Sequence, residues 1–311
     1  MKDLAGTLPR VPKILQRWFG TTVAAERLAA WRLGCGLALL FDILFFYVPF
    51  FETFFGSQGL AAPDVFSCRR TAPYWNWSIL SVWHHSATAY IGLVLWLLSA
   101  VAILIGWHTR WAAVMAWILS LSFYNSNFYL HNSGDRLRHF LLILLMVAPA
   151  DSAWCLKKRA PSANPVAVPA WPITLMLLQL SLMYFMNGIY KIQDPMWKDG
   201  SVLHYINYDA FWARWSARAI PVWCLPVLAW FTMVWEAGFP VWMQFRQTRQ
   251  LALLVGVVFH LYTFFHLELA AFPLYALCLY LPLAPWECLA RRTMRMDEGK
   301  SAQPPSTPAL P

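Results

Sequence analysis

The chain has 311 residues, of which 59% are hydrophobic, 17% are aromatic and only 13% are charged. Soluble domains are about 45–50% apolar and about 25% charged, so this composition excludes an ordinary soluble protein and indicates an integral membrane protein. The formal net charge of +9 does not indicate nucleic acid as a partner, because basic residues of multi-pass membrane proteins gather in cytoplasmic loops. The expected surroundings are therefore the lipid bilayer.

The two ends of the chain differ from the apolar remainder. The first twenty residues contain no continuous apolar core followed by a small-residue cleavage site, so we expect the first span to be retained as an anchor. We predict a cytoplasmic N-terminal segment over 1–26 and a transmembrane domain over 27–290. The stretch DEGKSAQPPSTPALP is too poor in apolar residues to fold, which predicts a disordered cytoplasmic tail over 291–311.

Apolar stretches that approach the roughly 20 residues needed to cross a bilayer predict an all-α protein, a bundle of about eight transmembrane helices. They lie at 31–51, 87–107, 111–129, 139–156, 171–191, 224–245, 250–267 and 269–289. With the N-terminus inside, sixteen lysines and arginines fall in cytoplasmic segments and eight on the other side. This asymmetry predicts that both termini are cytoplasmic.

Two long connections then face the outside, at about 52–86 and 192–223, and both are rich in aromatic residues. They contain APYWNWSILSVWHH and YINYDAFWARWSARAIPVW. Tryptophan and tyrosine favour the headgroup region, where one edge of the ring stays in water. We therefore expect aromatic-rich interfacial segments on the outer side.

The fifth span ends in YFMNGIYKIQDPMWKDG, where Tyr184, Asn187 and Lys191 lie three and four residues apart and so share one helical face. An ionisable residue inside a span costs about 2.5–3.5 kcal/mol, so each needs a partner or a purpose. Lys191 either extends to the outer headgroups or turns inward. If it turns inward, burial disfavours the ammonium form and makes the amine a usable general base.

Other polar residues interrupt the apolar stretches. Asp42 is open to pairing with a donor on a neighbouring helix, and His260 is either a hydrogen-bonded packing residue or a functional imidazole. Glu236 lies one turn before Pro240, which favours a kinked helix carrying an inward carboxylate. Two further stretches, SFYNSNFYL and YLHNSGDRLRHF, are rich in polar residues. The second stretch is either a solvated turn or part of a membrane mouth. Together they contain Asn125, Asn127, His131, Asp135, Arg136, Arg138 and His139.

Several kinds of site are not indicated by the sequence. The six cysteines form no CxxC pair and no Cys/His cluster with zinc spacing, so we expect no metal, and at most Cys68 and Cys224, which lie near span ends, could pair. There is no nucleophile elbow, phosphate-binding glycine loop or HExxH motif. Any chemistry must rest on a base, a carboxylate and imidazoles inside an apolar pocket, which fits a lipid-soluble substrate.

An ordered series of short motifs resembles the vitamin K-dependent gamma-glutamyl carboxylases and their bacterial relatives, the horizontally transferred transmembrane domain (HTTM) proteins. The likeness covers roughly residues 27–290. The motifs are LAAWRLGCGLALLFDI with Arg32, Gly36 and Asp42; LIGWHTR with Gly106 and Arg110; YNSNFYL; GIYKIQDPMWKDGSVLHY with Gly188, Lys191, Trp197, Gly200 and Tyr205; EAGFP; and FH.

The resemblance implies a mechanism. In the carboxylases, the lysine that matches Lys191 is thought to deprotonate reduced vitamin K, after which O₂ and CO₂ take part in glutamate carboxylation and quinone epoxidation. By this likeness we expect Lys191, Glu236 and His260 to be catalytic and a reduced vitamin K or menaquinone-type quinol to be bound. We expect a quinol pocket formed by Asn125, Asn127, Tyr184, Asn187, Trp197, Gly200 and Tyr205, and structural polar roles for Arg32, Asp42 and Arg110.

Two departures from the family pattern keep other functions open. The carboxylases have a histidine where this chain has Asn127, and the animal enzymes continue into a long lumenal portion that binds a propeptide. The quinol half of the chemistry is therefore better supported than carboxylation of a peptide or protein on the outer side. The alternatives are a non-carboxylating quinone-linked redox or peptide-maturation protein, and a non-catalytic scaffold or transporter. The bacterial likeness suggests a plasma-membrane location.

Overall fold

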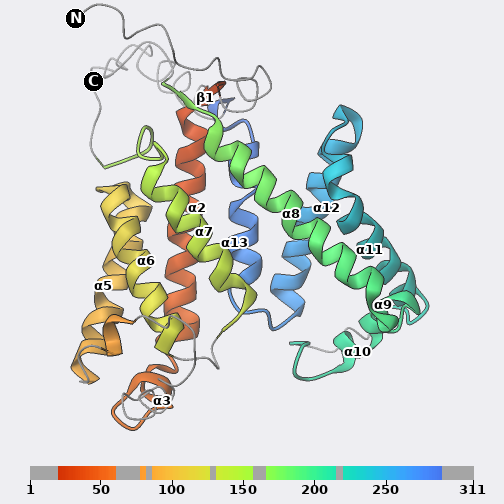
Figure 1. Ribbon diagram of the computed structural model, residues 1–311, viewed down its shortest axis with the longest axis horizontal. Coiled ribbons are helices and arrows are strands. Elements are labelled where there is room, and N and C mark those ends of the chain that lie inside the picture. The colour runs from red at the N-terminus through yellow and green to blue at the C-terminus, as the bar shows by residue number, and fades with distance from the viewer. Residues whose placement is uncertain are drawn as a thin grey trace, which may run out of the picture.

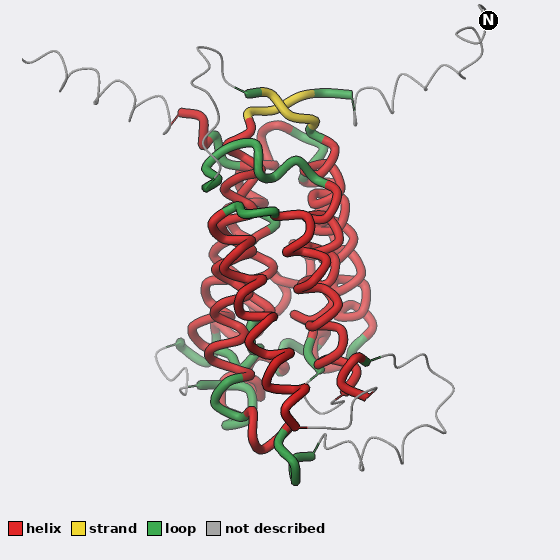
Figure 2. Tube along the Cα trace, turned by 90° about the vertical axis from the view of Figure 1, so that its left-hand side faces the viewer, coloured by secondary structure: helices red, strands yellow, loops and turns green. Residues whose placement is uncertain are grey.

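A computed structural model describes residues 20–60, 78–81, 86–126, 131–156, 166–214 and 220–288. The helices run side by side along one main direction, with loops gathered at both ends of the bundle (Figure 2). The predicted tail over 291–311 lies outside the described residues, as do Cys68, Asn127 and residues 1–19 of the N-terminal segment.

The first half of the chain forms a layer in which each long helix packs against the next. It consists of α2 (Ala25–Asp42), continued by the π-helical turn Ile43–Tyr47, α3 (Phe51–Phe55), the 3₁₀ turn Ile79–Ser81, α5 (Ser86–Ile105), α6 (Thr109–Ser126) and α7 (Ser133–Val147). Helix α2 packs on α5, α5 on α6, and α6 on α7 (Figure 1).

The second half forms a second group of helices. It consists of α8 (Trp171–Gln193), α9 (Pro195–Lys198), α10 (Val202–Tyr208), α11 (Cys224–Trp242), α12 (Arg246–His266), α13 (Phe272–Cys278) and the 3₁₀ turn Leu281–Leu283. Helix α8 packs closely on α11. Helix α13 contacts α12 on one side and α2 and α7 on the other, so it joins the two halves (Figure 1).

A short antiparallel ribbon departs from the all-α prediction. Strand β1 (Thr22–Ala24) pairs with β2 (Ala167–Pro169), with Val23 opposite Val168. Because each strand lies just before a long helix, the ribbon places the first residues of α2 and α8 at the same end of the bundle (Figure 1). The predicted topology, in which the first and fifth spans both start from the cytoplasmic side, agrees with this arrangement.

Each of the eight predicted spans overlaps a helix, but within the described residues five helical segments are long and apolar enough to cross a membrane. These are Ala25–Tyr47, Ala87–Ile105, Trp171–Gln193, Cys224–Trp242 and Arg246–His266. They establish a multi-pass membrane protein. The count of eight stays a prediction, because α7 and the Phe272–Leu283 segment are too short at 1.5 Å per residue to cover a hydrocarbon core of about 30 Å.

Two predicted spans have different bounds in the structure because of local signals. Helix α7 begins at Ser133 rather than 139, because the Asn132 side chain accepts from the Gly134 N–H at 2.8 Å and Asp135 accepts from the Asn132 N–H at 2.7 Å. It ends at Val147, because the next residue precedes Pro149 and a residue before proline disfavours the helical conformation. The predicted last span, 269–289, is interrupted after Cys278 and continues as a 3₁₀ turn that contains Pro282.

The short helices α3, α9 and α10 lie at the end of the bundle opposite the ribbon (Figure 1). They belong to the two aromatic-rich connections, and Tyr205, Phe211 and Trp223 are 59%, 73% and 75% exposed. An interfacial position for these segments stays a prediction, although their location at one end is compatible with it.

Candidate functional site

Lys191 turns into the protein and forms an ion pair with Glu236. Its Nζ donates to Glu236 Oε2, and the two side chains are 17% and 2% exposed. The pair joins the last turns of α8 to the middle of α11, so Lys191 does not extend freely to the headgroups. Of the two interpretations of this lysine, the inward one describes the structure.

Close packing between α8 and α11 brings the two partners together. Gly188, one turn before Lys191, faces the backbone of Ala237, and a Cβ at Gly188 would collide with the Ala237 N and Cα atoms. Because Ala237 follows Glu236, the missing side chain at Gly188 allows the two helices to approach where the ion pair forms. This gives a physical reason for glycine in the GIYK motif.

Trp197, on the short helix after α8, also contacts the lysine. The Lys191 Nζ lies 4.7 Å from the centroid of a Trp197 ring, within the range of a cation–π contact. Asp194 caps α9, with Oδ1 accepting from the backbone N–H groups of Met196 at 2.8 Å and Trp197 at 3.3 Å. Gly200 follows with a φ of +79°, a backbone conformation that favours glycine, and packs on Pro226.

Lys191 lies where two cavities meet. The first has a volume of about 610 Å³ and includes polar side chains: His131, Asn132, Ser133, Asn187, Lys191, Glu236, His260 and Glu268. The second has a volume of about 470 Å³ and is lined mainly by apolar residues of α10, α11 and α12. Both cavities are also lined by Trp212, Phe259 and Leu269. One elongated molecule with a polar head and an apolar tail fits this pair of cavities.

A short stretch before α11 and another after α12 contribute residues that line both cavities. The Arg214 N–H donates to the His266 carbonyl at 3.0 Å, and the Glu268 N–H donates to the Trp212 carbonyl at 2.8 Å. The Arg214 and Glu268 side chains form an ion pair at 3.1 Å. These contacts hold Trp212 beside the cavity into which Lys191 projects.

His260 belongs to a buried chain of hydrogen bonds at the same place. Its Nε2 lies 2.6 Å from the Tyr184 hydroxyl, which lies 2.6 Å from the Tyr280 hydroxyl. The three side chains come from α12, α8 and the segment after α13, and they are 0%, 1% and 7% exposed. Tyr184 therefore interacts with His260 rather than with Lys191, although Tyr184, Lys191 and His260 all line the first cavity.

The remaining predicted pocket residues are dispersed. Asn187 is exposed and lines the first cavity, whereas Tyr205 is exposed on α10 and Asn125 lies near the end of α6. The structure does not place Asn125 or Tyr205 among the residues that line the cavities beside Lys191. Asn127, which occupies the position of the family's histidine, lies outside the described residues. His131 lines the first cavity and stacks on Tyr124 with ring centroids 3.7 Å apart.

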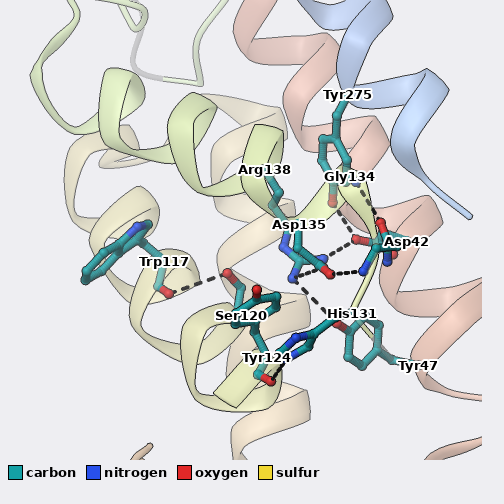
Figure 3. Close-up of polar contacts among 11 residues, drawn as sticks. Asp42, Tyr47, Trp117, Ser120, Tyr124, His131, Gly134, Asp135, Arg138 and Tyr275 are labelled. Carbon is teal, nitrogen blue, oxygen red and sulfur yellow. Dashed lines mark hydrogen bonds and ion pairs between the residues drawn. The ribbon is translucent and has the colours of Figure 1, made fainter. Parts of the chain in front are cut away.

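A second buried polar cluster surrounds Arg138 (Figure 3). Its guanidinium contacts Asp42 Oδ2 at 2.6 Å and Asp135 Oδ1 at 2.7 Å, and all three side chains are at most 2% exposed. The Tyr275 hydroxyl donates to Asp42 Oδ2 at 2.7 Å. The stretch that holds Asp135 and Arg138 is therefore not simply a solvated turn, although Arg136 within it is exposed.

Arg32 binds backbone rather than another side chain. Its guanidinium donates to four carbonyl oxygens, those of Ile103, Leu104, Ala150 and Trp154, at 2.5–3.0 Å. The first two are at the C-terminal end of α5, where carbonyl groups lack helical partners and a cation is favourable. A Cβ at Gly106, which has a φ of +71°, would lie 2.9 Å from Arg32 Nη1.

Gly36 and Arg110 complete the predicted structural motifs. A Cβ at Gly36 would lie 2.7 Å from the Cα of Leu104, so α2 and α5 approach closely there. Arg110 is exposed in the first turn of α6. No group of three or more His, Cys, Asp or Glu side chains suited to a metal ion occurs among the described residues.

Comparison with known families gives one match. The HTTM domain matches residues 22–284, which is most of the chain. The chain belongs to the HTTM domain family. This match confirms the resemblance seen in the motifs, and the HTTM domain is found in vitamin K-dependent carboxylases. No curated protein and no solved structure matched the chain.

The site of this HTTM protein was only partly predictable from the motifs. Lys191, Glu236 and His260 were predicted as site residues, and the structure places all three around one cavity. Tyr280, Trp212 and Glu268 were missed. Tyr280 lies in an apolar stretch with no polar neighbour that would mark it, and the other two reach the cavity only through pairing between loops.

Proposed function

We propose that this HTTM protein binds a membrane quinol and removes a proton from its ring hydroxyl group with the Lys191–Glu236 pair. The observation that carries the proposal is the position of this pair, where the polar cavity meets the apolar one. A polar ring would lie in the first cavity and an isoprenoid tail in the second. A reduced vitamin K or menaquinone, when bound, would supply the oxygen-dependent chemistry that leads to epoxidation and, with CO₂, to glutamate carboxylation.

The ion pair acts as one unit in this proposal. The lysine ammonium and the glutamate carboxylate together carry no net charge, so they are tolerated in a site shielded from water. The carboxylate can take up a proton from the ammonium, which leaves an amine able to accept one from the ligand. After that transfer the pair holds one more proton and a net positive charge, which favours a negatively charged ligand oxygen nearby.

The Trp197 ring supports the charged state of the pair. Its face attracts a cation and lies 4.7 Å from Lys191 Nζ, and its side chain lines the second cavity. We infer that Trp197 stabilises the ammonium form of Lys191 at the entrance between the two cavities.

The test uses membranes that contain the wild type or Lys191→Arg, supplied with reduced menaquinone or vitamin K and O₂. Arginine keeps the positive charge and the partner of Glu236, but its guanidinium stays protonated and cannot act as a base. We expect quinone epoxide, measured by mass spectrometry, from the wild type and at least about 100-fold less from the variant. Equal epoxide formation by a folded Lys191→Arg protein would disprove the assignment of the base.

A non-carboxylating quinone-linked protein is the second candidate. Both functions require a bound quinol, so the two cavities fit either one. The two functions differ only in the products that are formed. If the folded wild type binds quinone without forming epoxide, the redox or maturation function is favoured over the carboxylase-like one.

A further inference from the structure

The three groups of the Tyr280–Tyr184–His260 chain can share their hydrogens in two ways. In the first, Tyr280 donates to the Tyr184 oxygen, and Tyr184 donates to His260 Nε2. In the second, His260 Nε2 donates to Tyr184, and Tyr184 donates to Tyr280. The distances of 2.6 Å fit either direction, so the choice depends on what happens at the two ends.

The first arrangement satisfies every hydroxyl hydrogen of the chain. Tyr280 is 7% exposed, and Tyr184 is the one hydrogen-bond partner of its hydroxyl among the described residues. In the second arrangement the Tyr280 hydrogen would therefore lack a described acceptor. Buried donors are nearly always satisfied, since an unpaired one costs about 1–3 kcal/mol. In the first arrangement the hydrogen on His260 Nδ1 is the one without a described acceptor, so each arrangement leaves one buried donor unpaired. His260 lines the first cavity and Tyr280 is not among its lining residues, so a ligand there can accept from Nδ1 but not from Tyr280. The arrangement that a ligand completes therefore runs from Tyr280 through Tyr184 to His260 Nε2.

This direction determines where the imidazole hydrogen lies. If Nε2 accepts, an uncharged His260 carries its hydrogen on Nδ1. Nδ1 is buried and has no hydrogen-bond partner within the described part of the chain, while the His260 side chain lines the first cavity. No described carboxylate contacts the ring, so a charged imidazolium would be buried without a counter-ion.

We propose that His260 Nδ1 donates a hydrogen bond to a ring oxygen of the bound quinone or quinol, and that Tyr184 and Tyr280 position it for this task. The inference rests on the proposed function for its ligand class. Lys191 and His260 both line the first cavity, so both would then contact the oxygen-bearing ring. Tyr184 and Tyr280 are positioning residues, since they act through the imidazole.

Gly256 makes the chain possible. It lies on α12, one turn before His260, and a Cβ there would collide with the Tyr280 hydroxyl and lie 3.2 Å from the Tyr184 hydroxyl. Any larger residue at 256 would therefore displace the tyrosine that ends the chain. Gly256 packs on this hydrogen-bonded contact, which is a reason for glycine that the sequence alone does not provide.

The experiment measures the hydrogen bond directly on bound, oxidised menaquinone. Purified protein in detergent is loaded with menaquinone carrying ¹³C at the ring carbonyl carbons, and infrared difference spectra record the carbonyl stretching frequencies. A hydrogen bond weakens a carbonyl and lowers its frequency. In the wild type we expect one carbonyl band lowered relative to the free quinone, and in His260→Leu we expect that band to return toward the free value.

Matched variants separate the hydrogen bond from packing. The amide nitrogen of His260→Asn takes a position near Nδ1, whereas that of His260→Gln extends toward Nε2. We expect His260→Asn to retain the lowered band, His260→Gln to lose it, and His260→Leu to bind menaquinone roughly tenfold more weakly. Tyr184→Phe is expected to shift the band part of the way, because it leaves the imidazole free to change its tautomer.

Two results would overturn the inference, and they can be told apart. An unchanged carbonyl band in a folded His260→Leu protein that still binds menaquinone would remove His260 from the ring while leaving the proposed function intact. Failure of the folded wild type to bind menaquinone at all would exclude quinones as the ligand. Both the proposed function and the role of His260 would then be wrong.

Discussion

At the residue scale, the Lys191–Glu236 pair determines which substitutions are informative. Glu236 is 2% exposed on its side chain and its carboxylate is paired with Lys191, so removal of the lysine leaves a buried charge without a partner. Loss of one partner of a buried ion pair typically costs about 3–5 kcal/mol. An alanine variant at Lys191 would therefore combine loss of the base with loss of stability, which is why arginine is the better choice for activity.

Lys191→Met should destabilise the protein by about 3–5 kcal/mol, because Glu236 is left buried and unpaired. The double variant Lys191→Met with Glu236→Gln should recover much of that loss, since no charge is then buried. Thermal unfolding in detergent compares the two with the wild type. If the double variant is no more stable than Lys191→Met, the ion pair is not the cause of the destabilisation.

Glu236→Gln should reduce epoxide formation less than Lys191→Arg does. The amine remains and can accept a proton, but the group that takes up the second proton of the pair is lost. We expect a loss of roughly tenfold, against at least about 100-fold for Lys191→Arg. Measurement of both variants in the same membranes, normalised to folded protein, decides the order. Unchanged turnover together with unchanged quinol affinity would remove Glu236 from the site.

At the element scale, the approach of α8 to α11 is set by Gly188 and Ala237. Gly188→Ala should weaken the α8–α11 contact by about 1–3 kcal/mol and move Lys191 away from Glu236, because the added methyl group meets backbone atoms that cannot turn aside. Gly92→Ala on α5 is a matched control, since a Cβ there meets side-chain atoms at 3.5–3.7 Å. Thermal unfolding of both variants is the measurement, and equal stability of the two would contradict this role for Gly188.

The helices were more predictable than their ends and their partners. Hydropathy located a helix for every predicted span, because burial in lipid demands long apolar runs. It placed the start of α7 six residues late, because Asn132 and Asp135 form a cap within a polar stretch that hydropathy scores as loop. The ribbon between β1 and β2 was missed, since three residues on each side carry too little signal.

Site residues were predictable where helical spacing places them on one face of the same helix. They were less predictable where segments distant in the sequence meet. Tyr184 and Lys191 share the face of α8 that borders the cavity, as their spacing indicates. No spacing rule connects Asp42 to Arg138, which is 96 residues away, or Tyr184 to Tyr280. Such pairs depend on how α13 packs between the two halves, and periodicity within one helix contains no information on that packing.

At the scale of the whole molecule, α13 and the Arg138 cluster join the two halves of the bundle. Asp42 comes from α2, Arg138 and Asp135 from α7, and Tyr275 from α13 (Figure 3). The cluster holds two carboxylates around one guanidinium, all fully buried. Its hydrogen bonds therefore fix the relative positions of three helices, two of which belong to the first half and one to the second.

The strongest effect on the fold is expected from Arg138→Met. The substitution leaves Asp42 and Asp135, each only 1% exposed, without their cation, which should cost about 3–5 kcal/mol or more. Tyr275→Phe removes one of the groups that bind Asp42 and should cost only about 1–2 kcal/mol. Arg136→Met, at an exposed position two residues away on the same helix, is the control and should change stability little. Thermal unfolding in detergent measures all three. If Arg138→Met unfolds at the same temperature as Arg136→Met, the cluster does not hold the two halves together, and apolar packing of α13 against α2 and α7 must do so instead.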